Sequence, residues 1–520
     1  MKNNALKQIQ LMKPYNPPLS GRRNFGGLLL DFNERVKPPS SKVKKALIDF
    51  LNKDELQIYP EYGKLEEKIA SFLNINPDLI ITNGADQAID LIFRTFTKIG
   101  DVVIIPTPSF PMFYQSAGIV GNKIIAPLYN KTDLSFPVDE VLKNIAQHVK
   151  LIVICNPNNP TGTLLPLAGI EKIAKAAKDA IILIDEIYAE FSKVSAINLI
   201  EKYPNIIVAR SFSKAFGLAA LRVGYLVASS QNITELLKVR GPYDINMTAY
   251  IAALAALDDQ KDMQVYVDEV MQKAKPLVET FFLDNNILFY KSEANFILFK
   301  PVNPQEVEKI LRKNGILIRP QDKPGIQGTL RVSIGTVSQM QKFIDIYKKF
   351  VLNQEFSSKN KYAFIDRDGT LIFEPQDTFQ IDSLDKLKIL DGAIDGLKKL
   401  INMGYKLIMI SNQDGLGTNA FPQKDFELPQ NKMLETFEKE GINFEEIFIC
   451  PHLPSENCDC RKPKIGLVKD ILDDTDKETS FVYGDRESDK KFAENIGVKF
   501  IEMQTNDNFY KPLKKKGVIS

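Results

Sequence analysis

The sequence contains few Cys and His, no Trp and almost no net charge. Its 520 residues include no Trp, two His and four Cys, and the formal net charge at pH 7 is +2. So few Cys exclude a disulfide-stabilised scaffold, and a near-neutral charge gives no broad basic field for nucleic acid. No apolar run approaches the roughly 18–20 uncharged residues of a membrane span, and the first residues lack the apolar stretch of a signal peptide. We therefore expect a cytoplasmic protein that binds neither nucleic acid nor membrane.

Short apolar runs of strand length alternate with helical patterns along the chain. The runs before position 350 lie at 78–82, 101–106, 151–155, 180–185 and 205–210. They are rich in β-branched residues and lack polar alternation, which is typical of strands buried on both faces of a sheet. Strands spaced by helices predict an α/β protein with a mainly parallel sheet.

A polar stretch without periodicity, 351–360, interrupts this alternation. We predict a first domain over 1–352, a linker over 353–360 and a second α/β domain over 361–520. The second domain has strand-length runs at 361–366, 405–411, 444–450 and 480–485. The first domain is large enough that we expect it to divide again into a large and a small subdomain.

Four polar features follow predicted strands of the first domain, where open α/β sheets bind ligands. They are the junction 83–86, the Pro/Gly-rich loop 156–162, the segment 185–188, and the segment 211–217 with Arg222 after it. A carboxylate at the end of a buried strand, such as Asp185, costs free energy unless it meets a cationic partner. Lys214 follows a strand directly, whereas most Lys are solvated surface charges. Each feature alone has an ordinary explanation as a cap, turn or surface charge, and only their combination indicates a site.

Together these features resemble the fold-type I aminotransferases, which use pyridoxal phosphate and have a large mixed-sheet domain with a small α/β subdomain. The resemblance covers residues 25–350, and the four features occur along the chain in the same order as in that family. It implies that Lys214 forms the Schiff base and later moves a proton between Cα and the cofactor's C4′. It implies that Asp185 keeps the pyridine nitrogen protonated. The further contacts it implies are Tyr188 and Asn159 at the phenolate oxygen, Phe110 on the ring face, Gly84, Ala85, Asp86, Ser211, Ser213 and Arg222 at the phosphate, and Tyr59 at a phosphate across a homodimer interface.

Within that class, several segments look like histidinol-phosphate aminotransferase. They are IYPEYGKLEEKIA, NGADQAID, IDEIYAEF, GLAALRVGY, EANFILF, GILIRP and LRVSIGT. The resemblance implies that Arg319 and Arg331 accept the carboxylate of glutamate and the phosphate of imidazole-acetol phosphate in turn, since guanidinium geometry suits both. The ordinary alternative for either residue is an exposed or strand-edge Arg. Gln87 and Asp244 depart from the residues usual in that family.

The second domain has paired carboxylates after its first predicted strand. Asp366 and Asp368 are close enough in sequence to repel each other, so a bound cation is a natural cause. An isolated pair of this kind is usually a surface turn. Here, however, further polar residues follow the later strands, namely Ser411, Lys462, Asp485 and Asp489.

This arrangement resembles the Rossmann-like haloacid-dehalogenase phosphatases. The resemblance implies that Asp366 attacks phosphorus and that Asp368 serves as general acid and then base. It implies a Mg²⁺ site made by Asp366, the Asp368 carbonyl and Asp485. It also implies that Ser411 and Lys462 hold phosphoryl oxygens and that Asp489 orients the metal site or the lysine.

Three of the four Cys and one of the two His lie within eleven residues. Cys450, His452, Cys458 and Cys460 supply the four ligands of a closed tetrahedral Zn²⁺ site. A closed site has no open position, so we expect it to brace its loop rather than to catalyse. The other two residues of these types are predicted to be a small core residue, Cys155, and a surface residue, His148.

Two segments around these motifs, FEPQDTFQIDSLDKLKIL and SNQDGLGTNAFPQKDFELPQNKM, look like the histidinol-phosphatase part of bifunctional enzymes. The two resemblances imply two consecutive reactions, in which the product of the first is the substrate of the second. The sequence thus predicts a bifunctional enzyme of histidine biosynthesis that transaminates imidazole-acetol phosphate with glutamate and hydrolyses the resulting histidinol phosphate to L-histidinol. One alternative is another aminotransferase fused to a sugar phosphatase of the heptose-bisphosphate kind. Another is a non-catalytic sensor, against which the intact Lys214, Asp185, Asp366 and Asp368 argue.

Overall fold

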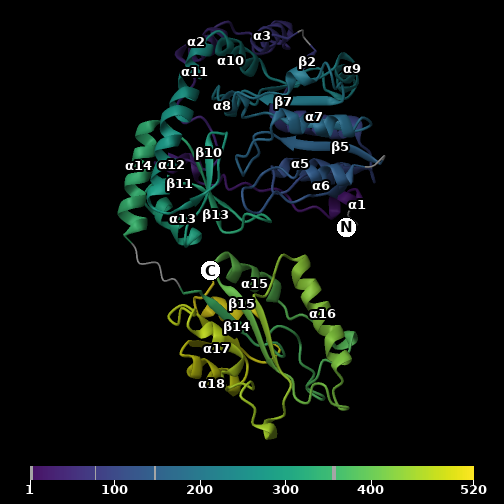
Figure 1. The fold of residues 1–520 in the computed structure, drawn as a ribbon, viewed down its shortest axis with the longest axis vertical. Coiled ribbons are helices and arrows are strands. Elements are labelled where there is room, and N and C mark those ends of the chain that lie inside the picture. Colours follow the sequence, from purple (N-terminus) through teal and green to yellow (C-terminus); the bar gives the residue numbers. More distant parts are fainter. Residues whose placement is uncertain (1–3, 76–77, 146–147, 354–358, 520) are drawn as a thin grey trace. The chain divides into compact units, whose positions relative to one another are not determined.

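The computed structural model describes residues 4–75, 78–145, 148–353 and 359–519. The chain forms two compact units, Met1–Gln354 and Glu355–Ser520, and Figure 1 shows the elements of each. Most of the predicted linker, 354–358, lies outside the described residues.

The first unit is built on a seven-stranded mixed sheet of order β2-β8-β7-β6-β5-β3-β4. Its strands are β2 (Leu79–Thr82), β3 (Val102–Ile104), β4 (Lys123–Ile125), β5 (Val149–Cys155), β6 (Ile181–Asp185), β7 (Ile206–Ser211) and β8 (Gly224–Val227). Strand β8 is antiparallel to both of its neighbours, and the other pairs are parallel. The sheet is therefore mainly parallel, as the β-branched runs predict, and the carboxyl ends of β5, β6 and β7 meet at one edge.

Helices pack on this sheet through apolar positions spaced three or four residues apart. Ile89, Ile92 and Phe93 of α4 (Gly84–Phe96) are fully buried in a core shared with Val103 and Leu183 of the sheet. The other helices of the sheet region are α5 (Pro111–Val120), α6 (Val138–Asn144), α7 (Leu167–Ala176), α8 (Ala189–Ser192) and α9 (Ser230–Val239). The remaining helices before position 270 are α1 (Lys7–Gln10), α2 (Ser41–Leu51), α3 (Gly63–Leu73), α10 (Met247–Leu257) and α11 (Gln260–Glu269).

A second, antiparallel sheet of the first unit has the order β12-β13-β10-β9. Its elements are β9 (Leu288–Phe289), β10 (Phe296–Lys300), β12 (Arg319–Gln321) and β13 (Thr329–Ser333), with α12 (Lys275–Asp284), α13 (Pro304–Lys313) and α14 (Val337–Tyr347) beside them (Figure 1). Near the N-terminus, β1 (Leu28–Leu29) pairs in parallel with β11 (Ile316–Leu317). This pairing holds the N-terminal segment against residues that lie about 290 positions later in the chain.

The second unit contains a five-stranded sheet in which every pair is parallel, of order β16-β15-β14-β17-β18. The strands are β14 (Tyr362–Ile365), β15 (Lys406–Asn412), β16 (Glu446–Cys450), β17 (Phe481–Gly484) and β18 (Lys499–Glu502). The chain runs outward from β14 in both directions, so β14 lies at the switch point of the sheet. Ligands bind at such points, outside the carboxyl ends of the strands.

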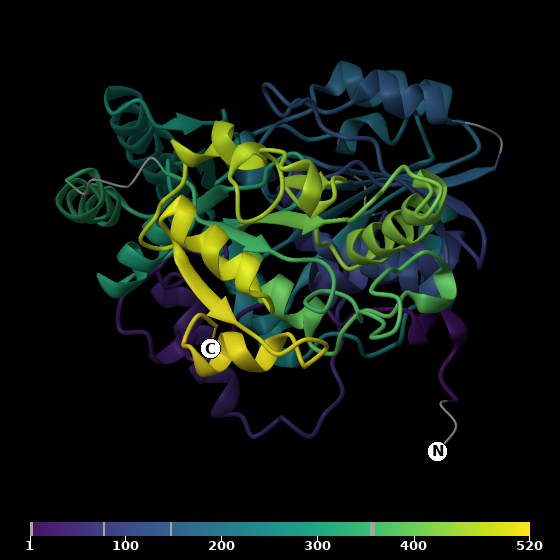
Figure 2. The same ribbon diagram turned by 90° about the horizontal axis from the view of Figure 1, so that it is seen from below.

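Alternate residues of β14 enter two different cores. Ala363 and Ile365 pack with α15 (Ala393–Asn402), α16 (Gln423–Lys439) and α19 (Tyr510–Lys515), whereas Tyr362 and Phe364 pack with residues of α17 (Lys469–Leu472) and α18 (Glu487–Ile496). Both faces of the sheet are therefore covered by helices (Figures 1 and 2). In keeping with this, β14 and β17 are buried along their whole length.

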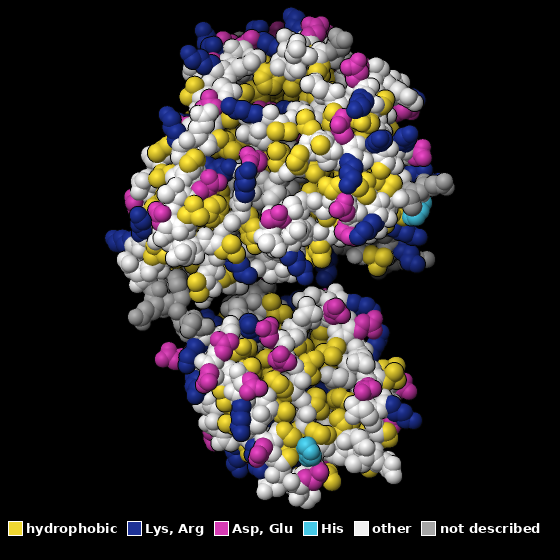
Figure 3. Space-filling view, viewed as in Figure 1, with side chains coloured by type: hydrophobic (Ala, Val, Ile, Leu, Met, Phe, Trp, Pro, Cys, Tyr) yellow, Lys and Arg dark blue, Asp and Glu magenta, His cyan; other side chains and the backbone are white. Residues whose placement is uncertain are grey.

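The surface carries interspersed charges. The face drawn in Figure 3 mixes Lys and Arg with Asp and Glu, without an extended area of one sign, in keeping with the net charge of +2. Of the helices described, none combines the length and the apolar character needed to cross a bilayer.

Candidate active sites

The carboxyl ends of β6 and β7 bring Asp185 and Lys214 into one site. Asp185 is the last residue of β6, and its burial raises the pKa of its carboxyl to about 7. Burial, with a further contribution from Arg331, lowers the pKa of Lys214 to about 8. Lys214 Nζ donates to the Phe32 carbonyl at 2.9 Å and lies 5.8 Å from the centre of the Tyr188 ring. Both groups that the resemblance assigns to the cofactor's chemistry are therefore largely shielded from water, and burial shifts the pKa of each. Such shifted pKa values are typical of functional sites.

The residues predicted to hold the cofactor phosphate gather at the start of α4. Arg222 Nη1 donates to Ser213 Oγ at 3.3 Å, and its Nη2 donates to Asp86 Oδ2 at 3.0 Å. A Cβ on Gly84 would lie 2.6 Å from Arg222 Nη2, so glycine is needed for this close approach. Ala85 is the second residue of the helix, and Ser211 Oγ accepts from the Ser213 N–H at 3.1 Å. Free N–H groups at a helix start, two hydroxyls and a guanidinium form a set that fits a phosphate.

Tyr188 lies near Lys214 and contacts a residue that sequence reasoning missed, whereas Asn159 contacts the predicted Arg331. Arg331 Nη1 donates to Asn159 Oδ1 at 2.5 Å, and its Nη2 donates to the Asp31 carbonyl at 2.6 Å. Asn33 Nδ2 donates to the Tyr188 hydroxyl at 3.0 Å. Asn33 adopts a positive φ of 55°, a conformation that Asn tolerates better than most residues. No local pattern in the sequence marks Asn33, because its contact is with a residue far along the chain.

The two arginines predicted to bind substrate retain donors without partners. Arg331, on β13, is buried, and the Arg319 guanidinium on β12 lies 5.4 Å from the centre of the Phe32 ring. Arg319 Nη1 and Arg331 Nε are buried and have no hydrogen-bond partner among the described residues. Buried donors normally have partners, so an anionic ligand is the natural complement of these two groups.

The last two residues predicted for the cofactor lie on different surfaces. Phe110 is the N-cap residue of α5 and packs edge-on against Phe113, with ring centres 5.9 Å apart. Tyr59 is 72% exposed, and its ring stacks on that of Tyr243 at 4.3 Å. An exposed Tyr59 suits a residue that reaches a second subunit, which stays a prediction.

In the second unit, a buried lysine joins two carboxylates after the strands. Lys462 Nζ donates to Asp366 Oδ1 and to Asp489 Oδ1, each at 2.5 Å, and to the Ile410 carbonyl at 2.9 Å. Burial opposes the charge of Lys462, but the two carboxylates outweigh that effect and raise its pKa. Asp366, the predicted nucleophile, therefore has a cationic side chain within hydrogen-bond distance.

Asp368 lies in a different environment from Asp366. Arg367 Nη1 donates to its Oδ1 and Gln413 Nε2 to its Oδ2, each at 2.5 Å, and Gln413 Nε2 also contacts Ser411 Oγ at 2.8 Å. Burial raises the pKa of the Asp368 carboxyl. A carboxyl that keeps its proton more readily suits a general acid. Sequence reasoning missed Arg367 and Gln413, although Gln413 follows the predicted Ser411 by two residues.

A group of acidic side chains at the same edge could hold a cation. Carboxylate oxygens of Asp366, Asp485 and Asp489 lie within 4.8 Å of one another. Asp485 Oδ2 is buried without a hydrogen-bond partner among the described residues. An unpaired buried carboxylate oxygen is costly unless a cation meets it, and oxygen ligands are those that Mg²⁺ prefers. The predicted ligands Asp366 and Asp485 are thus together, while the Asp368 carboxylate is engaged by Arg367 and Gln413.

The four residues of the predicted zinc site also converge. One ligand atom each from Cys450, His452, Cys458 and Cys460 lies within 4.8 Å of the others. The Sγ atoms of Cys450 and Cys458 are 3.6 Å apart, and His452 Nδ1 lies 3.1 Å from Cys460 Sγ. Zinc–sulfur bonds of about 2.3 Å place tetrahedral sulfurs about 3.8 Å apart. The other two sulfur–sulfur distances, 3.2 and 3.3 Å, are shorter than this value. The cluster therefore fits a zinc ion in composition, and its atoms lie somewhat closer together than bound ligands would.

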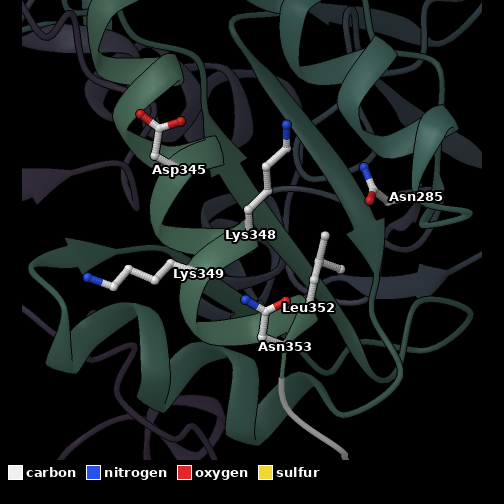
Figure 4. Close-up of a pocket in the computed structure, with 6 residues that line it drawn as sticks. All are labelled: Asn285, Asp345, Lys348, Lys349, Leu352 and Asn353. Carbon is white, nitrogen blue, oxygen red and sulfur yellow. The ribbon is translucent and has the colours of Figure 1, made fainter.

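The remaining Cys and His lie outside this cluster. Cys155 is buried in the core of the first unit, with its Sγ 3.9 Å from Asp185 Oδ2. His148 is exposed. A separate surface pocket of about 500 Å³ lies at the end of α14 (Figure 4) and contains none of the predicted site residues; it is lined by Asn285, Asp345, Lys348, Lys349, Leu352 and Asn353.

Comparison with known proteins identifies the first unit. The family model described as aminotransferase class I and II matches residues 27–346. The chain belongs to this aminotransferase family. This membership supports pyridoxal phosphate as the cofactor of the present aminotransferase. A second family model, described as polynucleotide kinase 3 phosphatase, matches residues 361–510 and supports a phosphatase-type domain there.

Individual relatives of the aminotransferase cover its first unit. The histidinol-phosphate aminotransferase of Methanocaldococcus jannaschii is 33% identical over 372 residues, which are 68% of this chain and 98% of that protein. That of Ruminiclostridium cellulolyticum is 32% identical over 345 residues, 65% of this chain and 95% of that protein. The solved structure of histidinol-phosphate aminotransferase from Sinorhizobium meliloti in complex with pyridoxal-5′-phosphate has a TM-score of 0.61 at 22% identity, and covers 67% of this chain and 99% of that one. The fold-type I fold of the first unit is thereby confirmed.

Proposed function

We propose that this aminotransferase is a bifunctional enzyme that transfers the amino group of glutamate to imidazole-acetol phosphate and then hydrolyses the L-histidinol phosphate formed. The observation that carries the first activity is the pair of arginines, Arg319 and Arg331, each with a buried donor that has no partner among the described residues. The charge of Arg331 acts on Lys214. The names of the relatives, which match the first unit over nearly their whole length, support the same substrate.

In the proposed transamination, residues of the first unit bind and move protons around the cofactor. When bound, pyridoxal phosphate supplies the electron sink that acidifies the Cα–H bond of the amino donor. Asp185 offers its buried carboxylate to a protonated ring nitrogen. Lys214 Nζ, with a pKa near 8, accepts the proton from Cα and returns it at the end of the half-reaction. Arg222 and Ser213 hold the cofactor phosphate at the start of α4.

The two arginines account for the use of two different substrates. Glutamate presents a distal carboxylate, whereas imidazole-acetol phosphate presents a phosphate. Planar guanidinium groups donate in pairs to both kinds of anion. Arg331 keeps its Nε free for this purpose while its Nη atoms bind Asn159 and the Asp31 carbonyl.

In the proposed hydrolysis, an Asp366 oxygen attacks phosphorus and the bond between phosphorus and the substrate's ester oxygen breaks. Asp368 gives its proton to that oxygen, releasing histidinol. A water then attacks the phosphorus of the acyl phosphate, Asp368 takes its proton, and inorganic phosphate and free Asp366 result. Lys462 and Ser411 bind the phosphoryl oxygens. A Mg²⁺ ion held by Asp366, Asp485 and the Asp368 carbonyl would supply charge neutralisation.

The test of this function is the product of a coupled reaction. Purified full-length protein with pyridoxal phosphate and Mg²⁺ is incubated with imidazole-acetol phosphate and glutamate. We expect equal amounts of L-histidinol, inorganic phosphate and 2-oxoglutarate by chromatography and phosphate assay. A protein that accumulates histidinol phosphate without hydrolysing it would contradict the phosphatase assignment. Preferred hydrolysis of a heptose bisphosphate would support the sugar-phosphatase alternative.

We further propose that Cys450, His452, Cys458 and Cys460 bind a structural zinc ion. Purified protein should contain one zinc per chain by elemental analysis. Because metal binding couples to folding, Cys458→Ser should lose the zinc, lower the melting temperature of the second unit by at least about 5 °C and weaken the phosphatase. Transamination should stay unchanged.

His148→Asn, at an exposed position, is the control and should keep the zinc. Zinc-free wild-type protein of unchanged stability would show that the structural role is wrong.

A further inference from the structure

A third cation, Lys323, accompanies the two arginines of the first unit. Lys323 lies between β12 and β13, the strands that carry Arg319 and Arg331. Its Nζ donates to the Ser109 carbonyl, directly before Phe110, the residue predicted to contact the ring face. The Ser109 hydroxyl in turn donates to Asn158 Oδ1 at 2.8 Å. Lys323 therefore reaches from the small sheet to the loops that precede Phe110 and Asn159.

The three cations lack an ion-pair partner in the part of the chain that the structure describes. Among the residues that the structure describes, no ion pair with Asp or Glu is found for Lys323, Arg319 or Arg331. Asp31, which lies close to Arg331, forms its ion pair with Arg22 at 2.8 Å. Burial, and then the charges of Arg331 and Arg319, lower the pKa of Lys323 to about 8. A cluster of like charges in a desolvated place is costly, and it persists where an anionic ligand compensates the charge.

The number of charges indicates which anion fits best. Two guanidinium groups suffice for the single charge of a carboxylate. A phosphate monoester carries close to two negative charges at neutral pH and three oxygen acceptors. We propose that Lys323 is a third cationic ligand of the substrate phosphate, which makes this site prefer a phosphorylated substrate over a carboxylate-bearing one. This inference rests on the proposed function and adds to it a residue that determines specificity.

A purely structural role for Lys323 makes a different prediction. If Lys323 only ties its loop to the Ser109 carbonyl, its loss disturbs Phe110 and the ring site, and both half-reactions suffer alike. If it binds phosphate, only the phosphorylated substrate is affected. The comparison of the two half-reactions therefore separates the two roles.

The experiment uses the full-length holoenzyme and follows each half-reaction by the change in cofactor absorbance. In Lys323→Gln, we expect the dissociation constant for histidinol phosphate to rise at least about tenfold, since a charge-assisted contact is lost. The constant for glutamate and the rates at saturation should change less than about twofold. Lys323→Arg should restore most of the affinity. Lys300→Gln, at an exposed position on β10, is the matched control. Equal losses for both substrates would overturn the proposal.

A second measurement does not depend on the identity of the substrate. Inorganic phosphate and acetate are compared as inhibitors of the glutamate half-reaction. We expect Lys323→Gln to weaken inhibition by phosphate about tenfold and to leave inhibition by acetate unchanged. If imidazole-acetol phosphate is not a substrate but phosphate inhibition still depends on Lys323, the proposed function fails and the phosphate preference stands. If phosphate inhibition is insensitive to Lys323, the inference fails whatever the substrate.

Discussion

Asp366→Asn is expected to lower phosphate release from histidinol phosphate by at least about a thousandfold, a loss of the size seen when catalytic nucleophiles are removed. The neutral amide cannot attack phosphorus, and it also loses the charge that Lys462 meets at 2.5 Å. Asparagine has nearly the same size, so the second unit should remain folded. Transamination should be unchanged because Lys214 and Asp185 belong to the first unit. Phosphate release and 2-oxoglutarate formation are measured on the same preparation.

The control for this variant is Asp470→Asn, at an exposed position on α17. It should keep both activities. Full phosphatase activity in Asp366→Asn would show that Asp366 is not the nucleophile. If folded Asp366→Asn protein lost both activities, the proposal that the two sites work independently would be wrong.

Lys214→Ala is expected to have the second large effect, a fall in transamination of at least about a thousandfold. The variant lacks the amine that we propose binds the cofactor covalently and moves the proton at Cα. The visible absorbance band of protein-bound pyridoxal phosphate should disappear as well. Lys214→Arg should be equally inactive, because a guanidinium keeps the charge but is not a nucleophile at neutral pH. Histidinol-phosphate hydrolysis should be unaffected in both variants.

Lys238→Ala, at an exposed position on α9, serves as the control and should keep the band and the activity. A Lys214→Ala protein that still transaminates would assign the proton transfer to another group. The absorbance measurement does not depend on which amino acid is the substrate, so it tests the cofactor site separately from the pathway.

The central strands could be predicted because strands buried on both faces consist of continuous apolar runs rich in β-branched residues. The runs 151–155 and 180–185 correspond to β5 and β6 within two residues. Strand β4, in contrast, has three residues at the sheet edge, two of them exposed, so its composition differs little from that of a loop. The two-residue strands β1 and β11 are too short to show any period and form only because they pair with each other.

The candidate sites could be predicted where chemistry follows a strand directly. Asp185 and Lys214 lie at strand ends of the first unit's sheet, and Asp366 lies at a strand end of the second unit's sheet. Asn33 and Lys323 could not be found in this way. Asn33 contacts Tyr188 across 155 positions, and Lys323 contacts Ser109 across 214 positions. Such contacts depend on how the two sheets of the first unit pack, about which no local pattern carries information.

The N-terminal segment also has a consequence for the order of events on the ribosome. The Asn33 N–H donates to Ser333 Oγ across 300 positions, and Leu30 exchanges backbone hydrogen bonds with Leu317 and Ser333. At about 5–20 residues per second, about 15–60 s of synthesis separate these two ends. The transaminase site therefore matures only as the last strand of its sheet emerges. The candidate site of the second unit, whose residues span 366–489, starts to be translated only about thirty residues later, so the two sites can assemble one after the other in chain order.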